Sequence, residues 1–176
     1  MVFKQWEDRS DQELFKIVFD LASHNNLPPQ TGLTLTAVPL AKAKVAHSRA
    51  SRSKSQGFFD TDLQIENIKT GLLGELLVLK HEKTLLKNSG RTDLAEDVVH
   101  VSVEISDGAG YDILSFSNDG TRKLIEVKTT RNPDSGAAFF ITANEVEVSK
   151  ENQEEYFIYR VYSLSEDGKT GKYWFQ

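Results

Sequence analysis

The residues best suited to chemistry lie in one short apolar segment, 124–130, which is predicted to be a β-strand. Alternate side chains of a strand share a face, so Glu126 and Lys128 point the same way while the residues between and beside them point into the core. Asp112 lies fourteen residues before Glu126, in a second strand-like run, and a neighbouring strand can bring the two carboxylates together. Two carboxylates and a lysine amine at adjacent strand ends predict a site for a hard divalent cation and a water molecule.

Magnesium is the expected cation, because it prefers an octahedron of oxygen ligands. We expect Asp112 and Glu126 to supply carboxylates and the Val127 backbone carbonyl to supply a third oxygen. The ion would lower the pKa of a bound water and stabilise charge that develops on phosphorus. Lys128 could orient that water, accept its proton if burial depresses the lysine pKa, or hold a phosphate oxygen. Glu75, in a predicted helix, could hold a second metal ion through water.

Simpler interpretations of the same residues stay open at this level. A Glu-x-Lys pattern on a strand is common as an ion pair on a solvated face, and Glu75 could be an exposed glutamate of its helix. Serine and cysteine hydrolases are not supported, because the chain has no Gly-x-Ser-x-Gly elbow and no cysteine. It also has no Gly-x-x-x-x-Gly-Lys-Ser/Thr loop, so an ATP-driven step would need another subunit or domain.

The composition predicts a soluble globular protein, since the 176-residue chain is 39% hydrophobic and 27% charged. No apolar run approaches the roughly 20 residues that span a bilayer, and residues 1–8 lack a signal-peptide core. We therefore expect a cytoplasmic protein with no membrane contact. Cysteine is absent and the four histidines show no paired ligand spacing, so oxygen-ligated Mg²⁺ or Ca²⁺ is favoured over transition metals.

Positive charge is concentrated in one segment of an acidic chain. The formal net charge is −5, but residues 1–20 contribute −2, residues 21–59 contribute +5 and residues 60–176 contribute −8. The basic segment is either a solvated loop or a contact for phosphates, which such an island can neutralise even on an acidic protein. The candidate nucleic-acid-binding residues are Thr130, after the Glu126–Lys128 strand, and the basic side chains Lys42, Lys44, Arg49, Arg52 and Lys54.

Hydrophobic periodicity and turn residues predict an α/β fold with a mixed sheet. Helices are expected at residues 10–23, 62–90 and 142–152, the first and last opened by capping boxes. Strands are expected at residues 33–38, 98–106, 111–117, 123–130, 138–141, 156–164 and 172–175, the last as an edge strand. We divide the chain into an N-terminal extension, residues 1–60, and a folded domain, residues 61–176.

Two glycines, Gly71 and Gly74, lie inside the predicted long helix. Each costs about 1 kcal/mol of helix stability relative to alanine. We therefore expect another element to approach the helix backbone closely at these positions.

Five ordered motifs, taken together, resemble the NO VEIN C-terminal-like family. They are Gly71-x-x-Gly-Glu75, Gly110-Tyr-Asp-Ile113, Ile125-Glu-Val-Lys-Thr-Thr130, Phe139-Phe-Ile-Thr-Ala-Asn-Glu145 and Tyr156-x-x-Tyr-Arg-Val161. That family belongs to the PD-(D/E)XK nuclease superfamily, near the Mrr-like restriction endonucleases. The resemblance covers residues 65–164 and leaves the N-terminal third outside it.

The resemblance implies a restriction-endonuclease-like core of helix, three-stranded meander, short strand, helix and strand, with a small N-terminal extension. By motif position, Asp112 resembles the first metal-binding aspartate, Glu126 the second acid, Lys128 the catalytic lysine and Glu75 the acid on the preceding helix. Such nucleases hydrolyse phosphodiesters with Mg²⁺, for which Mn²⁺ can substitute, and commonly leave a 5′-phosphate. Tyr111 stands where many members have proline, which is a frequent departure.

The implied function is that of a magnesium-dependent DNA endonuclease in restriction or phage defence. A homodimer is expected because duplex cleavage needs two cuts, and family domains often sit beside ATPases, helicases or methyltransferase-linked modules. The alternative is a nuclease-fold DNA-binding or assembly module that does not cleave by itself and acts within a larger defence complex. RNA is a less favoured substrate, because no aromatic platform interleaved with basic residues is visible.

Overall fold

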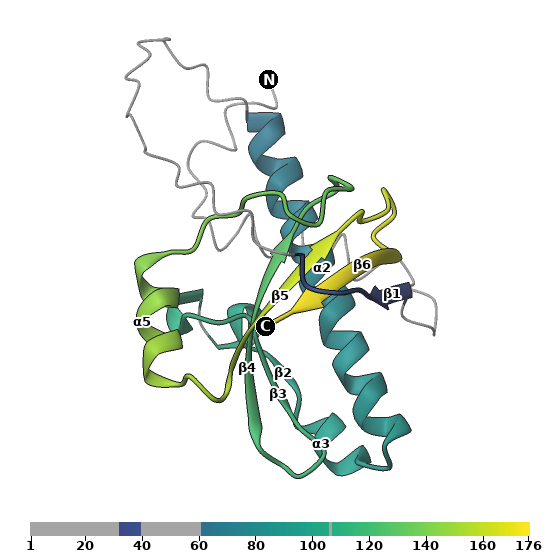
Figure 1. Ribbon diagram of the computed structural model, residues 1–176, viewed down its shortest axis with the longest axis vertical. Coiled ribbons are helices and arrows are strands. Elements are labelled where there is room, and N and C mark those ends of the chain that lie inside the picture. Colours follow the sequence, from purple (N-terminus) through teal and green to yellow (C-terminus); the bar gives the residue numbers. More distant parts are fainter. Residues whose placement is uncertain (1–31, 40–60, 106) are drawn as a thin grey trace, which may run out of the picture.

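The computed structural model describes residues 32–39, 61–105 and 107–176. Its helices are α2 (Thr61–Asn88), α3 (Thr92–Glu96), α4 (Val101–Glu104) and α5 (Ala143–Glu151), with a 3-10 turn η2 (Asp107–Ala109). Its strands are β1 (Gly32–Leu35), β2 (Val99–His100), β3 (Ile113–Phe116), β4 (Arg122–Thr129), β5 (Tyr156–Tyr162) and β6 (Thr170–Phe175). The long helix α2 crosses one side of a sheet that contains these strands (Figure 1).

Helix α2 extends over 28 residues and supplies one side of the hydrophobic core. Its apolar residues recur at helical spacing, and the buried ones are Leu72, Leu73, Leu77, Val78 and Leu86. The predicted end near Gly90 is confirmed, and the φ of this residue, 78°, is a left-handed conformation that glycine adopts without strain. The amides of Gly90 and Arg91 donate to the carbonyls of Lys87 and Leu86, at 3.0 and 2.9 Å, so the helix ends in a Schellman motif.

The sheet is mixed and has the strand order β1-β6-β5-β4-β3-β2. Strands β2, β3 and β4 form an antiparallel meander, and β4 and β5 are parallel with α5 between them in the chain. Strand β6 is antiparallel to β5 and parallel to β1. The predicted mixed α/β fold class is confirmed, and the arrangement is compatible with a restriction-endonuclease-like fold.

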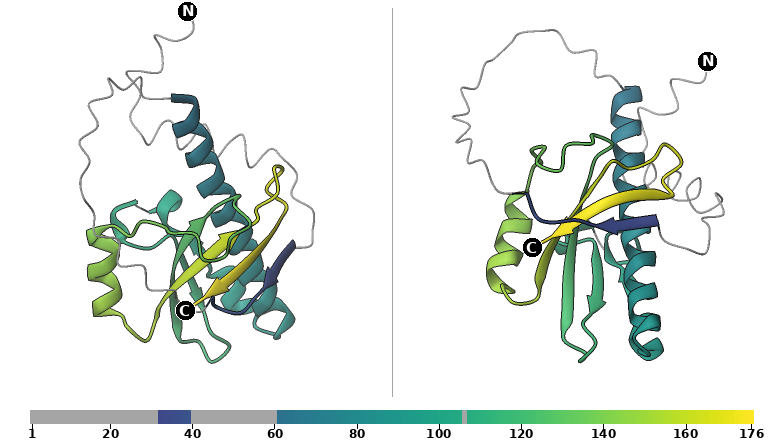
Figure 2. Two further views of the ribbon diagram at one scale, coloured as in Figure 1. Left: turned by 45° about the horizontal axis from the view of Figure 1, so that its top comes forward. Right: turned by 45° about the vertical axis from the view of Figure 1, so that its right-hand side comes forward.

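The two faces of β4 have different neighbours. Ile125 and Val127 belong to the hydrophobic core that α2 covers, where burial of such a side chain contributes about 1.5–3 kcal/mol. Because side chains alternate along a strand, Glu126 and Lys128 lie on the opposite face. Helix α5 lies on the side of the sheet away from α2 (Figure 2). The polar pair of β4 is therefore enclosed between the sheet and α5.

The predicted close approach to the helix backbone is confirmed for Gly74 only. A β-carbon on Gly74 would lie 1.9 Å from the hydroxyl oxygen of Thr129, so α2 and β4 come together where no side chain fits. A β-carbon on Gly71 would meet nothing within 4 Å. The prediction is therefore wrong for Gly71, which has open space beside it.

The predicted strand at residues 98–106 is interrupted after two residues. Only Val99 and His100 pair with β3. The amides of Val101 and Ser102 then both donate to the carbonyl of Asp112, at 2.8 and 3.3 Å, and this shared acceptor turns the chain into α4. The alternation of apolar and polar residues continues through this turn, so the sequence pattern alone does not show where the strand ends.

No strand forms at residues 138–141, where the sequence predicted one. Phe139 packs against Trp174 of β6 instead, with ring centroids 6.3 Å apart, while Phe140 is 94% exposed. This apolar segment packs over the surface of the sheet through Phe139 and forms no strand within it.

Strand β6 is not an edge strand, which corrects a further prediction. Strand β1 pairs with it in parallel, from Gly32 opposite Thr170 to Leu35 opposite Tyr173. β1 is also shorter than the predicted strand at residues 33–38. The pairing joins the two ends of the described chain, and local sequence patterns carry no information about such a distant partner.

The predicted helix at residues 10–23 and the basic segment lie outside the described residues, so neither prediction is tested. The division into residues 1–60 and 61–176 stays a prediction for the same reason, although β1 shows that part of the extension joins the sheet. In the parts of the chain that the structure describes, no helix combines the length and apolarity needed to cross a membrane.

Candidate active site

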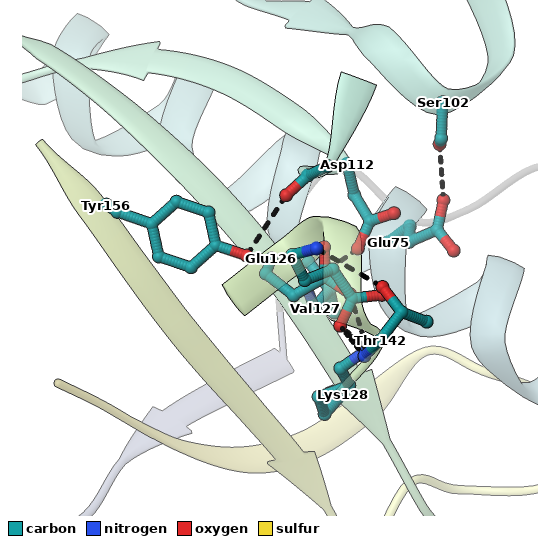
Figure 3. Close-up of polar contacts among 10 residues, drawn as sticks. Glu75, Ser102, Asp112, Glu126, Val127, Lys128, Thr142 and Tyr156 are labelled. Atoms are coloured by element: carbon teal, nitrogen blue, oxygen red, sulfur yellow. Dashed lines mark hydrogen bonds and ion pairs between the residues drawn. The ribbon is translucent and has the colours of Figure 1, made fainter. Parts of the chain in front are cut away.

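Asp112 lies immediately before β3 and is attached to β4 by two hydrogen bonds. Its amide donates to the Ile125 carbonyl at 2.9 Å, and its carboxylate oxygen Oδ2 accepts from the Val127 amide at 2.7 Å. The antiparallel register, in which Ile113 lies opposite Ile125, brings Asp112 to this part of β4. Asp112 is consequently beside Glu126, as the sequence predicted (Figure 3).

Glu75 reaches the same place from α2. It is only 8% exposed, its Oε2 accepts from the Ser102 hydroxyl at 2.9 Å, and the same oxygen lies 2.7 Å from Nε2 of His100. Ser102 and His100 come from α4 and β2, on either side of the turn that the Asp112 carbonyl holds. The interpretation of Glu75 as an exposed helical glutamate is therefore wrong.

Lys128 is held between two carboxylates. Its Nζ lies 2.6 Å from Glu126 Oε1 and 2.8 Å from Glu145 Oε2. The side chains of Lys128 and Glu126 are 16% and 7% exposed, so the pair does not lie on a solvated face. Burial acts to lower the pKa of Lys128, but the hydrogen bonds that its ammonium donates to Glu126 and Glu145 outweigh it and raise this pKa. Lys128 is therefore a cation here, and acceptance of a proton from water, one of its three expected roles, is disfavoured.

Glu145 is a site residue that the sequence did not assign. Helix α5 begins with the predicted capping box: Thr142 accepts from the Glu145 amide at 3.2 Å, and Glu145 Oε2 accepts from the Thr142 amide at 3.1 Å. The same Oε2 binds Lys128. The contact with Lys128 lowers the pKa of Glu145, although burial acts to raise it. The capping box indicated where Glu145 points locally, but only the docking of α5 brings it to Lys128.

Tyr156, at the start of β5, closes another side of the site (Figure 3). Its hydroxyl donates to the Gly110 carbonyl at 3.1 Å. Burial raises its pKa, and the charges of Glu126, Glu145 and Asp112 raise it further. The parallel register that places Tyr156 beside Leu124 carried no signal in the sequence, so its position at the site was not predicted.

The site holds an excess of negative charge. Burial raises the pKa of Asp112 well above its ordinary value, and Glu75 and Glu126 raise it further. Burial also raises the pKa of Glu126 to about 7, although Lys128 acts to lower it. A divalent cation would relieve this repulsion, and buried carboxylates are the oxygen donors that Mg²⁺ prefers.

The donor set fits a magnesium ion chemically, but the described arrangement is closed. Asp112, Glu126 and the Val127 carbonyl would hold it. Backbone carbonyls two residues apart on a strand point in the same direction, so the Val127 carbonyl points to the side on which the Ile125 carbonyl accepts from the Asp112 amide. Glu75 would act through water. In the described residues, no group of three or more histidine or acidic side chains is positioned to hold a metal ion. Binding would therefore require Lys128 to release Glu126.

The candidate nucleic-acid-binding residues are only partly described. Thr130 follows β4, and its hydroxyl accepts from the Asn132 amide at 3.1 Å. The basic residues Lys42, Lys44, Arg49, Arg52 and Lys54 lie outside the described residues. The structure therefore brings Glu75, Asp112, Glu126, Val127 and Lys128 together and does not test the basic segment.

The fold and the site define a mixed α/β protein with a buried cluster of carboxylates and one lysine at the end of its sheet. Residues 74–173, more than half of the chain, match the family described as Protein NO VEIN, C-terminal. The chain belongs to this family. No curated protein and no solved structure matches it.

Proposed function

We propose that the protein is a magnesium-dependent DNA endonuclease of the PD-(D/E)XK type, close to the Mrr-like restriction enzymes. The observation that carries the proposal is the convergence of Glu75, Asp112 and Glu126 with Lys128 in a buried, negatively charged site. Membership of a nuclease-like family supports the same conclusion. When bound, the ion supplies an activated water and stabilises charge on the phosphoryl oxygens. Mn²⁺ would substitute because it accepts the same ligands.

The residues of the chain would divide the remaining tasks. Asp112 and Glu126 would hold the ion, and Glu75 would act on it through water. Lys128, cationic and free to leave Glu126 once that carboxylate binds metal, would orient the water or neutralise a phosphate oxygen. Glu145 would keep the lysine within reach, since it binds the same Nζ.

The biological setting is part of the proposal. A nuclease of this kind would act on DNA in the cytoplasm, in restriction or phage defence. Two cuts are needed to break a duplex, so we propose a homodimer as the active form. An ATPase, helicase or methyltransferase subunit would be a fitting partner, because this sequence has no nucleotide-binding loop of its own.

Plasmid cleavage in Mg²⁺ tests the proposal. We expect the Asp112→Asn and Lys128→Met variants to lose about 100-fold or more of the cleavage rate, as removal of one transition-state contact commonly does. Two matched variants serve as controls: Asp119→Asn in the β3–β4 turn and Lys172→Met on the exposed face of β6. They should cleave like the unsubstituted protein. Equal rates in all five proteins, or cleavage in none, would reject the catalytic assignment.

A second function is favoured by the closed state of the site. Lys128 binds two carboxylates and the Asp112 carboxylate accepts from the Val127 amide, so these groups have hydrogen-bond partners without metal, although the negative charge is not balanced. We infer a non-cleaving DNA-binding or assembly module as the alternative. It predicts salt-dependent DNA binding that Lys128→Met leaves unchanged. Metal-dependent cleavage by the isolated chain would eliminate it.

A further inference from the structure

Arg160 is a buried cation on the same face of the sheet as Lys128. It is 3% exposed, in the middle of β5. In the parallel pairing of β4 and β5 its register partner is Lys128, so the two side chains leave the sheet on the same face from adjacent strands, about 4.8 Å apart.

The guanidinium of Arg160 lacks the partner that a buried charge requires. Its Nε has no hydrogen-bond partner, and its Nη2 makes one long contact to the Ala137 carbonyl, at 3.4 Å. The ring of Phe139 lies 5.2 Å from the guanidinium carbon. Among the residues that the structure describes, no carboxylate lies within 4 Å of it. An ion buried without a counter-charge costs several kcal/mol, and one cation–π contact returns about 1–2 kcal/mol.

One segment, residues 132–141, contributes the Ala137 carbonyl and the Phe139 ring that contact Arg160, and we call it the covering segment. It contains no helix or strand. Besides its contacts with Arg160, the segment is attached through the Asn132 carbonyl, which accepts from the Ser163 amide at 3.0 Å, the Ser135 carbonyl, which accepts from the Trp174 indole at 3.0 Å, and Phe139, which packs on the ring of Trp174. A segment attached in this way can move without disturbing the core beneath α2.

We propose that Arg160 binds a backbone phosphate of the nucleic acid, next to the group that Lys128 serves, once the covering segment moves aside. This inference rests on the proposed function and deepens it by adding a phosphate-binding residue. The planar guanidinium can bind a phosphate through two parallel hydrogen bonds, and the unpartnered Nε is one of the donors required. The neighbouring carboxylates Glu126 and Glu145 are occupied by Lys128 and do not compete for it.

The salt dependence of DNA binding tests the inference directly. Affinity for a short duplex is measured at several salt concentrations with Ca²⁺ in place of Mg²⁺, for the unsubstituted protein, Arg160→Met and Arg122→Met. Arg122 is a matched control, because it lies at the far end of β4 and forms an exposed ion pair with Glu155. Loss of one phosphate contact should reduce the slope of log K against log salt by about 0.9 in Arg160→Met alone.

The outcomes separate this inference from the proposed function. No DNA binding by the unsubstituted protein overturns both. Binding with an unchanged slope in Arg160→Met overturns the inference and leaves the nuclease proposal standing. A purely structural Arg160 would lower the melting temperature without changing the slope.

Two further variants keep the test decisive if Arg160→Met does not fold. Phe139→Ala removes the ring over the guanidinium, so uncovering it becomes easier and DNA binding should tighten by about two- to five-fold. Arg160→Lys keeps the charge but loses the forked geometry, so the slope should be retained while affinity falls. No tightening in Phe139→Ala together with full affinity in Arg160→Lys would overturn the inference.

Discussion

Two buried lysine–carboxylate pairs lie on opposite faces of β4, one at each end of the strand. Lys123 lies 2.7 Å from Glu82 of α2, and Lys128 lies 2.6 Å from Glu126. The first pair faces the helix that covers the core, and the second faces the candidate active site. The two pairs differ in the number of acids around the lysine.

The Glu82 pair is balanced. Glu82 is 1% exposed, and its carboxylate accepts from the Ser115 hydroxyl at 2.8 Å, the Tyr159 hydroxyl at 2.9 Å and Lys123. The lysine also donates to Tyr159. One anion meets one cation and every donor has an acceptor, so this cluster is a structural element of the core.

The Lys128 pair is unbalanced. The lysine binds Glu126 and Glu145, while burial and the nearby charges of Glu75 and Glu126 raise the pKa of Asp112. Apolar residues could fill this space without the cost of burying charge. Buried acids that lack counter-charges are commonly found at functional sites, so the difference between the two clusters supports a metal site at the Lys128 cluster only.

The largest effect should follow from removing the acid of the balanced pair. Glu82→Ala leaves the ammonium of Lys123 without a counter-charge, and we expect a loss of about 3–5 kcal/mol in the free energy of unfolding, measured by urea denaturation. Glu82→Gln, which can still accept hydrogen bonds, should lose less. A loss below about 1 kcal/mol in Glu82→Ala would show that the cluster is not the closed structural unit described above.

The unbalanced cluster should make the stability of the metal-free protein depend on pH. The pKa of Glu126 is about 7 in the folded protein against an ordinary 4.5, so the folded state binds this proton more tightly than the unfolded state. Ionisation of Glu126 should therefore lower stability by up to about 3 kcal/mol as pH rises from 4.5 to 7, and the raised pKa of Asp112 should add to the fall. Denaturation in EDTA at a series of pH values measures this fall. The fall should become smaller in Glu126→Gln, where only Asp112 still contributes, and persist in full in Glu82→Gln.

Magnesium should stabilise one cluster and not the other. At ten times its dissociation constant, an ion that binds only the folded protein adds about 1.4 kcal/mol to the free energy of unfolding. We expect this gain in the unsubstituted protein and in Glu82→Gln, and its absence in Asp112→Asn. A gain of equal size in Asp112→Asn would show that the ion binds elsewhere and that neither cluster is the metal site.

The smallest effect should come from the cap that positions Glu145. Thr142→Ala removes the hydroxyl that accepts from the Glu145 amide, at an expected cost of about 1 kcal/mol. The loss should appear as faster amide hydrogen exchange in α5 and leave α2 unchanged. Ser149→Ala, which removes a hydroxyl from the same helix away from the cap, should behave like the unsubstituted protein. Equal exchange in both variants would contradict a role for the cap in holding Glu145 beside Lys128.

The site was predictable to the extent that its residues repeat with the period of a strand. Glu126 and Lys128 are two apart, which places them on one face whatever surrounds the strand. Asp112 could be assigned because a hairpin with a short turn joins its strand to theirs. Glu145 and Tyr156 could not, because their positions depend on how α5 docks and on the parallel pairing of β4 with β5.

Errors in the predicted elements have the same origin. The alternation at residues 98–106 and the apolar run at residues 138–141 are local properties, but a strand also needs a partner, and these segments meet the Asp112 carbonyl and the Trp174 ring instead. Strand β1 shows the converse case. Its short segment becomes part of the sheet only because β6, far away in the chain, leaves an unpaired side.

The sequence by itself determined the class of fold, the long helix with its end at Gly90, and the face shared by Glu126 and Lys128, because these depend on periodicity and on backbone conformations that few residues adopt. Only the tertiary structure decided which acidic side chains are buried next to one another. Glu75 and Glu82 are seven residues apart on α2, yet one joins the unbalanced cluster and the other the balanced one. The charge of a buried site depends on neighbours from several strands and helices, and that sum exists only after the chain has folded.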